Sequence, residues 1–200
     1  MGLFSFRNFF KPKKAITPGF APDEYVPIFW EDDYCQIEMV PFQNKTFIQK
    51  QAEQINELAG KSKTQYGFME TFERGPMPFK TISKKIRVNY LEDTLTGFQF
   101  LKARYIRYNK NEILECEKEN TKAFGFTNFT IFFDIENEFV KNIWISTGLI
   151  SSVTQYDLIV AALCTLGKNC ELILIDWNSL SFFDLADKVQ VNKYLWNLWK

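Results

Sequence analysis

The segment WEDDY carries the densest group of side chains that could do chemistry. Glu31, Asp32 and Asp33 follow one another between Trp30 and Tyr34. Neighbouring carboxylates can bind a cation, transfer protons or face a basic partner. In a strand the second acid points away from the other two, so the triplet cannot converge on one point. A solvated turn before a strand is its commonest meaning. A surface for a basic protein, with the two aromatic rings as anchors, is the next.

The chain contains no histidine. Histidine is the commonest general base and the commonest ligand of transition metals. Its absence excludes Ser-His-Asp and Cys-His hydrolysis, and it excludes HExxH zinc sites. Any catalysis would have to use carboxylates, lysine, tyrosine or cysteine.

Four further acids lie in or beside apolar runs that predict strands: Asp134, Glu136, Glu138 and Asp176. Together they could form an oxygen-only site for Mg²⁺ or Ca²⁺, as a carboxylate- or metal-dependent enzyme of nuclease or hydrolase type would need. The spacing of an EF-hand loop and the glycine patterns of phosphate-binding loops are missing. Asp176 is more typical of a strand-end residue that binds the amides of the next turn. The sequence therefore predicts no catalytic residue, no metal ligand and no cofactor.

The four cysteines are Cys35, Cys116, Cys164 and Cys170. A zinc site built from cysteines normally uses close pairs, and the sequence has no CxxC. Cys164 lies in an apolar helical run, and Cys170 begins an apolar strand-like run. We expect buried free thiols in a reducing cytosol, which predicts a cytoplasmic protein.

The charge balance argues against a nucleic-acid partner. Lysine plus arginine and aspartate plus glutamate number 24 each, whereas nucleic-acid-binding proteins usually carry a basic field. One segment does combine cations with aromatic rings, as platforms for single-stranded nucleic acids do. Its side chains are Lys102, Arg104, Arg107 and Lys110 with Tyr105 and Tyr108. In a regular strand the first two cations fall opposite the third, so we expect an exposed strand face with aromatic cross-strand pairs.

Residues 1–24 predict an extended leader, followed by a single domain over residues 25–200. Prolines keep the leader from forming regular structure. Residues 3–14 combine apolar and basic side chains, so a weak contact with a membrane surface stays open beside the alternative of a flexible leader. No run approaches the ~18 apolar residues of a membrane span.

Hydrophobic periodicity predicts an α+β fold, a mainly antiparallel sheet flanked by about three to four helices. The 21 phenylalanines supply a core strongly driven by burial. The predicted strands span residues 34–40, 66–72, 98–108, 126–135, 139–146 and 170–177, and the predicted helices span 46–59, 156–166 and 188–200. Residues 82–96 fit either a short helix or extended chain. The turn Glu136-Asn137-Glu138 predicts an antiparallel hairpin between its two flanking strands.

Residues at the predicted helix ends have the chemistry of caps. Ser152 or Thr154 can cap the helix that follows it, and Asp187 begins a capping box with the glutamine three residues later. Gly60 and Gly167 are placed to end two helices in a left-handed conformation.

In general style, the chain resembles the small cytoplasmic immunity proteins that bacteria encode beside polymorphic or contact-delivered toxins. The points of likeness are the short leader MGLFSFRNFFKPKK, one Phe- and Trp-rich α+β domain, the absence of a catalytic motif, and acidic–aromatic surface candidates. The resemblance implies a protein that binds a toxin domain and blocks its active site. It assigns no individual residue to that task.

We therefore hypothesise a non-catalytic inhibitor that binds a protein partner. The contact residues predicted from the acidic segment are Trp30, Glu31, Asp32, Asp33 and Tyr34. Clustered acids suit a basic, nuclease-like toxin surface by charge complementarity. The alternatives are the carboxylate- or metal-dependent enzyme and a structural or scaffold subunit, for which a large apolar surface patch would be the sign.

Overall fold

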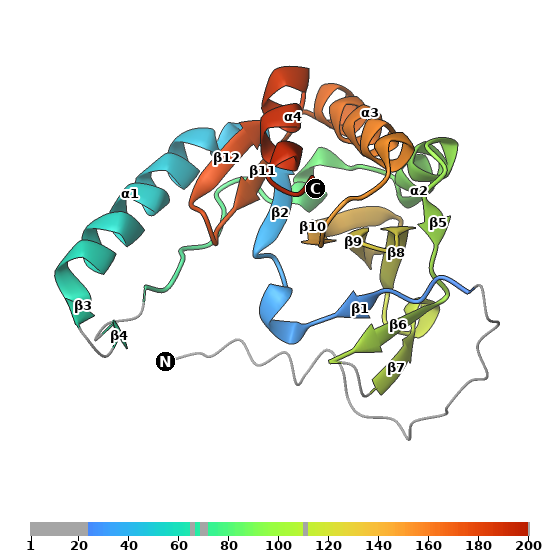
Figure 1. The fold of residues 1–200 in the computed structure, drawn as a ribbon, viewed down its shortest axis with the longest axis horizontal. Coiled ribbons are helices and arrows are strands. Elements are labelled where there is room, and N and C mark those ends of the chain that lie inside the picture. Colours follow the sequence, from blue (N-terminus) through green and yellow to red (C-terminus); the bar gives the residue numbers. More distant parts are fainter. Residues whose placement is uncertain (1–23, 65–66, 69–71, 110–111, 200) are drawn as a thin grey trace.

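A seven-stranded antiparallel sheet forms the centre of the molecule (Figure 1). The structure is a computed structural model and describes residues 24–64, 67–68, 72–109 and 112–199. In spatial order the strands are β12 (Ser181–Asp184), β11 (Leu172–Asp176), β2 (Ile37–Pro41), β10 (Phe139–Thr147), β9 (Phe129–Glu136), β8 (Thr121–Phe126) and β5 (Leu101–Lys102). The order mixes early and late segments, so the sheet joins both halves of the chain.

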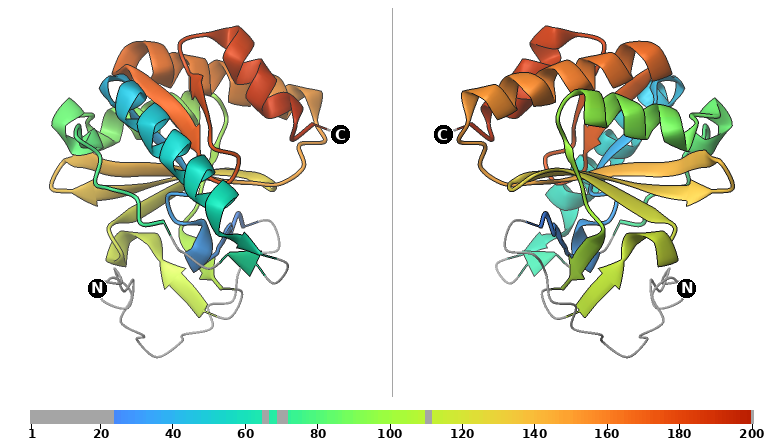
Figure 2. Two further views of the ribbon diagram at one scale, coloured as in Figure 1. Left: turned by 90° about the vertical axis from the view of Figure 1, so that its left-hand side faces the viewer. Right: turned by 90° about the vertical axis from the view of Figure 1, so that its right-hand side faces the viewer.

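Three helices cover one face of this sheet, which we call the helical face (Figure 2). They are α2 (Val88–Gly97), α3 (Val153–Cys170) and α4 (Lys188–Trp196). Leu172 and Leu174 of β11 and Leu163 of α3 belong to one buried cluster on this side. Alternate residues of a strand point to opposite faces, so Ile173 and Ile175 point to the other side, where they join a separate cluster.

The opposite face is covered by two separate elements. Helix α1 (Lys45–Ser62) packs Ile48 against Val40 and Ile173 of the sheet. A small sheet of β1, β6 and β7 covers β8 to β10. The bounds of its strands are Ile28–Phe29, Tyr105–Tyr108 and Glu112–Glu115. Figure 2 shows this small sheet on the side of the large sheet away from α3 and α4. Because both faces are covered, the interior strand β11, with the sequence LILID, is apolar almost throughout.

Several short elements connect these layers. They are the two-stranded hairpin of β3 (Lys63–Thr64) and β4 (Gly67–Phe68), and the 3₁₀ turns η2 (Glu31–Asp33), η3 (Phe42–Asn44), η4 (Thr81–Lys84) and η5 (Cys116–Lys118). The turn η4 and helix α2 resolve the ambiguity over residues 82–96. Of the predicted strand 66–72, two residues form β4, and residues 66 and 69–71 lie outside the described residues.

The predicted class, a single compact α+β domain with a mainly antiparallel sheet, is confirmed. The hairpin of β9 and β10 forms around Asn137, whose φ is 59°. Ser152 caps α3 by accepting a hydrogen bond from the amide of Gln155. Asp187 caps α4 by accepting from the Val189 amide at 2.8 Å. The predicted capping box does not close, because the Gln190 side chain donates to the Asp187 carboxylate and accepts from the Asp184 amide.

Three predicted helix ends are wrong. The helix predicted over residues 188–200 ends at Trp196. Helix α1 continues beyond Gly60, where Lys61 pairs with Glu57 one turn back at 2.6 Å. Helix α3 continues past Gly167 to Cys170, and Glu171 takes the left-handed conformation instead. Gly167 has a packing role, because a Cβ there would lie 2.2 Å from the carbonyl carbon of Leu185.

Two predicted strands also need correction. The strand predicted at 34–40 begins only at Ile37, because Cys35 has a left-handed φ of 51° and turns the chain. The strand predicted at 98–108 is two strands in different sheets. The chain leaves the large sheet after Lys102, Ala103 is buried between the layers, and β6 begins at Tyr105 in the small sheet.

No helix in the described part of the chain is long and apolar enough to cross a membrane. Residues 1–23 of the predicted leader, including the segment 3–14, lie outside the described residues.

Candidate functional site

The acidic segment forms a 3₁₀ turn at the edge of the small sheet. Trp30 precedes η2, and its carbonyl accepts a hydrogen bond from the amide of Asp33 at 3.0 Å. A 3₁₀ helix has three residues per turn, so three successive side chains point in three directions. The strand geometry that we considered from the sequence is therefore wrong, although the acids still do not converge. We call Trp30 to Asp33 the acidic turn.

The acidic turn is anchored at its N-terminal end by the small sheet. Phe29 is 2% exposed and packs its ring 5.5 Å from that of Phe132. The Glu31 amide donates to Asn109 Oδ1 at 3.1 Å, and the Tyr108 hydroxyl donates to Glu31 Oε2 at 2.7 Å. These contacts fix both the backbone and one carboxylate of the turn.

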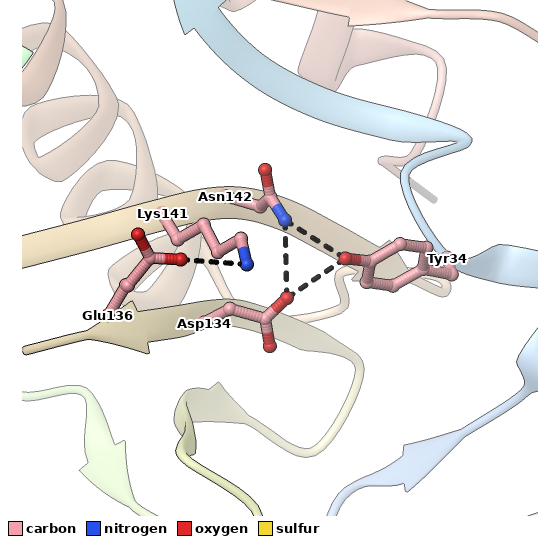
Figure 3. A network of polar contacts seen from close by, with 5 residues as sticks. All are labelled: Tyr34, Asp134, Glu136, Lys141 and Asn142. Carbon is pink, nitrogen blue, oxygen red and sulfur yellow. Dashed lines mark hydrogen bonds and ion pairs between the residues drawn. The ribbon is translucent and has the colours of Figure 1, made fainter. Parts of the chain in front are cut away.

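Its C-terminal end is anchored by Tyr34, which points inward to a polar network on the large sheet (Figure 3). The Tyr34 hydroxyl donates to Asp134 Oδ2 at 2.9 Å. The Asn142 amide donates to the Tyr34 hydroxyl at 3.0 Å and to Asp134 Oδ2 at 3.3 Å, and Thr121 donates to Asp134 Oδ1 at 2.8 Å. Strands β8, β9 and β10 thus hold the residue that follows the acidic turn.

Burial sets the electrostatics of this network. It raises the pKa of the half-buried Asp134 carboxyl, and the hydrogen bonds from Thr121, Tyr34 and Asn142 oppose that rise. Burial and then the Asp134 charge raise the pKa of Tyr34, so its hydroxyl stays protonated and able to donate. A half-buried carboxylate with three donors has most of its hydrogen-bonding capacity satisfied.

The remaining side chains of the acidic turn face outward. Trp30 is 39% exposed, Glu31 and Asp32 are exposed, and Asp33 is partly exposed. Burial and the neighbouring Asp32 charge raise the pKa of Asp33. Four of the five predicted contact residues therefore reach the surface, and Tyr34 serves as their support.

The acids that the enzyme alternative would need bind separate partners. Glu136 pairs with Lys141 at 2.9 Å, and Glu138 pairs with Arg87 at 2.7 Å. Asp176 accepts from the amide of Asn178 at 2.9 Å and from the amide and hydroxyl of Ser179, as a strand-end residue does. Among the residues that the structure describes, no three Cys, Asp or Glu side chains lie where they could hold one metal ion.

The cations and aromatic residues of the segment 102–110 likewise bind separate partners. Lys102 pairs with Glu92 at 3.0 Å, and Arg104 lies 3.8 Å from Glu115. Tyr108 supports the acidic turn, as described above. Lys110 lies outside the described residues.

The cysteines are free thiols, as predicted, with three buried and Cys35 half-buried. Burial raises the pKa of Cys116 to about 12 and that of Cys35 well above its usual value. Because the thiolate is the nucleophile, these thiols are poorly suited to nucleophilic chemistry near neutral pH.

The sequence interpretation missed two half-buried polar residues. Glu38 accepts a hydrogen bond from the Trp177 indole at 2.7 Å, and Asn142 joins the Tyr34 network. Glu38 alternates with Ile37 and Met39, which normally predicts a solvated face. For Asn142 a signal was present in Asp134, the lone acid of the run FTIFFDI. A charge inside an otherwise apolar strand implies buried polar partners.

Comparisons with known proteins give no relative. No family model, no curated protein and no solved structure matches this chain.

Proposed function

We propose that this chain is a non-catalytic binding protein, and that its acidic turn recognises a basic surface on a protein partner. The observation that carries the proposal is the anchoring of the turn. Hydrogen bonds hold both of its ends, through Glu31 and through Tyr34, while Trp30 and Asp32 stay on the surface.

A rigid charged turn favours binding for two physical reasons. Ordering a flexible loop costs free energy on association, and a turn that is already fixed avoids that cost. Exposed carboxylates steer a basic partner and speed its association, whereas an aromatic side chain in their midst supplies an anchor that can be desolvated. The acidic turn presents both, with Trp30 beside Glu31 and Asp32.

The enzyme alternative has less support. Asp134, the most buried of the acids proposed for it, already accepts from Tyr34, Asn142 and Thr121. These bonds, which also hold the acidic turn, occupy most of the lone pairs of Asp134 and leave little capacity for a general base.

The finer assignment follows the resemblance to immunity proteins. In this proposal the partner is a toxin domain with a basic, nuclease-like surface, and the chain works in the cytoplasm. The inhibitor covers the toxin's active site. It acts by binding a surface of complementary shape and charge, and it catalyses no reaction itself. Its four free cysteines are compatible with a reducing compartment.

The test is capture of the product of the adjacent gene by the purified chain. We expect Asp32→Lys to weaken the complex by at least about tenfold, because the substitution places a repulsive charge against a basic surface. Asp32 is exposed and makes no hydrogen bond on which the fold depends, so the variant should keep its unfolding midpoint. The affinity is measured by calorimetry in low salt.

Glu117→Lys is the matched control, since Glu117 is an exposed acid in the 3₁₀ turn η5 and the substitution changes the net charge equally. It should leave the affinity nearly unchanged. Equal weakening by both variants would mean that only the overall charge matters, and no weakening by either would remove the acidic turn from the interface.

A further inference from the structure

A second feature, a groove of about 400 Å³, opens on the face of the large sheet that lies away from α3 and α4. It lies between strands β2 and β10 and the segment 76–82. Its apolar wall includes Val40, Met77 and Phe79, and its polar floor includes Glu38 and Asn142. The volume is within the range of about 300–1,000 Å³ that is usual for small-molecule sites.

The floor presents hydrogen-bond acceptors. Asn142 directs its amide nitrogen to Tyr34 and Asp134, and Figure 3 shows its carbonyl oxygen turned away from both. No described residue donates to that oxygen. Glu38 accepts from the Trp177 indole at 2.7 Å and from the Cys35 thiol, and a carboxylate can accept about four bonds.

Strand register brings these two acceptors together. Glu38 of β2 lies opposite Trp144 of β10, and Asn142 is two residues away on the same face of β10. Such diagonal neighbours lie roughly 7–8 Å apart, with their Cβ atoms somewhat closer, which leaves room for one donor group between their polar ends.

The charges around the groove limit what can occupy it. The Lys141 ammonium is paired with Glu136 at 2.9 Å, so this pair adds no net charge. Arg74 lies over the Trp177 ring at 4.7 Å and donates to the Cys35 carbonyl at 3.3 Å, and its charge acts on the Glu38 carboxyl, whose pKa it lowers. Lys80 lines the groove and is exposed, so a positive charge stands on its open side.

We propose that the groove binds a small molecule with an aliphatic ammonium group. The ammonium lies between Glu38 and Asn142 and donates to both, and the carbon chain packs along Val40, Met77 and Phe79. Lys80, on the open side, favours a ligand that also carries a carboxylate, so aliphatic amino acids fit better than plain amines. This site is separate from the acidic turn and does not depend on the partner proposed above.

The electrostatics of the floor support the same occupant. Burial raises the pKa of the Glu38 carboxyl, and the Trp177 hydrogen bond and the Arg74 charge lower it only in part. A carboxylate held in such surroundings gains from a further cation placed against it.

The experiment is a titration of the ¹⁵N-labelled full chain, read at the Trp177 indole N–H, because that group donates to Glu38. The probes are norleucine, n-pentylamine and hexanoate, which carry both charges, the ammonium only and the carboxylate only. Norleucine and n-pentylamine should shift this resonance in a saturable way at concentrations on the order of 10 mM or below. Tighter binding of norleucine identifies amino acids as the ligand class, and equal binding identifies plain amines.

The matched variants are Glu38→Gln and Glu171→Gln. The first keeps an oxygen that accepts from Trp177, so the fold is retained, and it should weaken binding by at least about tenfold. The second removes an exposed carboxylate that pairs with Lys84 and lines other grooves, and it should leave binding unchanged. No saturable shift with either ammonium probe, equal binding of hexanoate, or unaltered binding by Glu38→Gln would overturn the proposal.

Discussion

Replacing Gly167 with alanine is expected to destabilise the fold by about 3 kcal/mol, because the added methyl group has no space. A Cβ at this position would lie 2.2 Å from the Leu185 carbonyl carbon and 2.5 Å from the Ala186 amide nitrogen. Both are backbone atoms, so neither can move aside by rotating a side chain. Helix α3 and the segment leading to α4 would have to separate, although their residues share the main core.

Urea unfolding of the variant measures this loss, and Gly60→Ala provides the control. Gly60 also lies within a helix, but no atom stands within 4 Å of a Cβ added there. Alanine at that site should stabilise the protein by about 0.5–1 kcal/mol, because it reduces the freedom of the unfolded chain and favours helix. Similar effects at the two positions would show that α3 does not pack so closely.

Replacing Asp134 with alanine is expected to cost about 2–3 kcal/mol of unfolding free energy. The change removes the Asp134 acceptor of the Tyr34 and Thr121 hydroxyls in a half-buried place, and it removes one of the two acceptors of the Asn142 amide. It also releases the C-terminal anchor of the acidic turn. Amide hydrogen exchange at residues 31–34 should therefore accelerate by more than the global loss of stability explains.

Glu138→Ala is the matched control for this second substitution. It removes a carboxylate from the exposed pair with Arg87, in which both side chains are about 60% exposed. Exposed pairs contribute little, so we expect a change within about 1 kcal/mol and no change in exchange at the acidic turn. If Asp134→Ala changed the unfolding free energy and the exchange rates as little as Glu138→Ala does, the Asp134 network would not hold the acidic turn in place.

Local signals predicted much of the framework. The caps at Ser152 and Asp187 and the hairpin turn at Asn137 depend on neighbours within a few residues, so the sequence contains all that is needed to find them. The apolar run of β11 likewise predicted an interior strand, and it lies between β12 and β2.

Predictions failed where distant segments decide the outcome. Gly167 resembles a helix end until the segment at Leu185 is known to pack against it. Lys102 and Tyr105 read as one strand, because nothing local shows that the chain crosses between two sheets there. The inward direction of Tyr34 requires Asp134, one hundred residues away, as its partner.

The candidate site also has features that the local sequence predicts and features that depend on distant residues. The acids and Trp30 could be placed on the surface from composition alone, because charged residues in a short segment seldom become buried. Their anchoring could not be foreseen, since it comes from Tyr108, Asn109 and Tyr34. Glu38 was overlooked because an acid alternating with apolar residues usually faces solvent, whereas here the distant Trp177 packs against it and donates to it.

Hydrogen exchange of the chain, alone and in complex with the product of the adjacent gene, tests the central claim most directly. The claim predicts that amides of residues 30–33 become protected on binding, and that the segments of α3 and α4 keep their exchange rates. Protection confined to another surface, with residues 30–33 exchanging as fast as in the free chain, would contradict it.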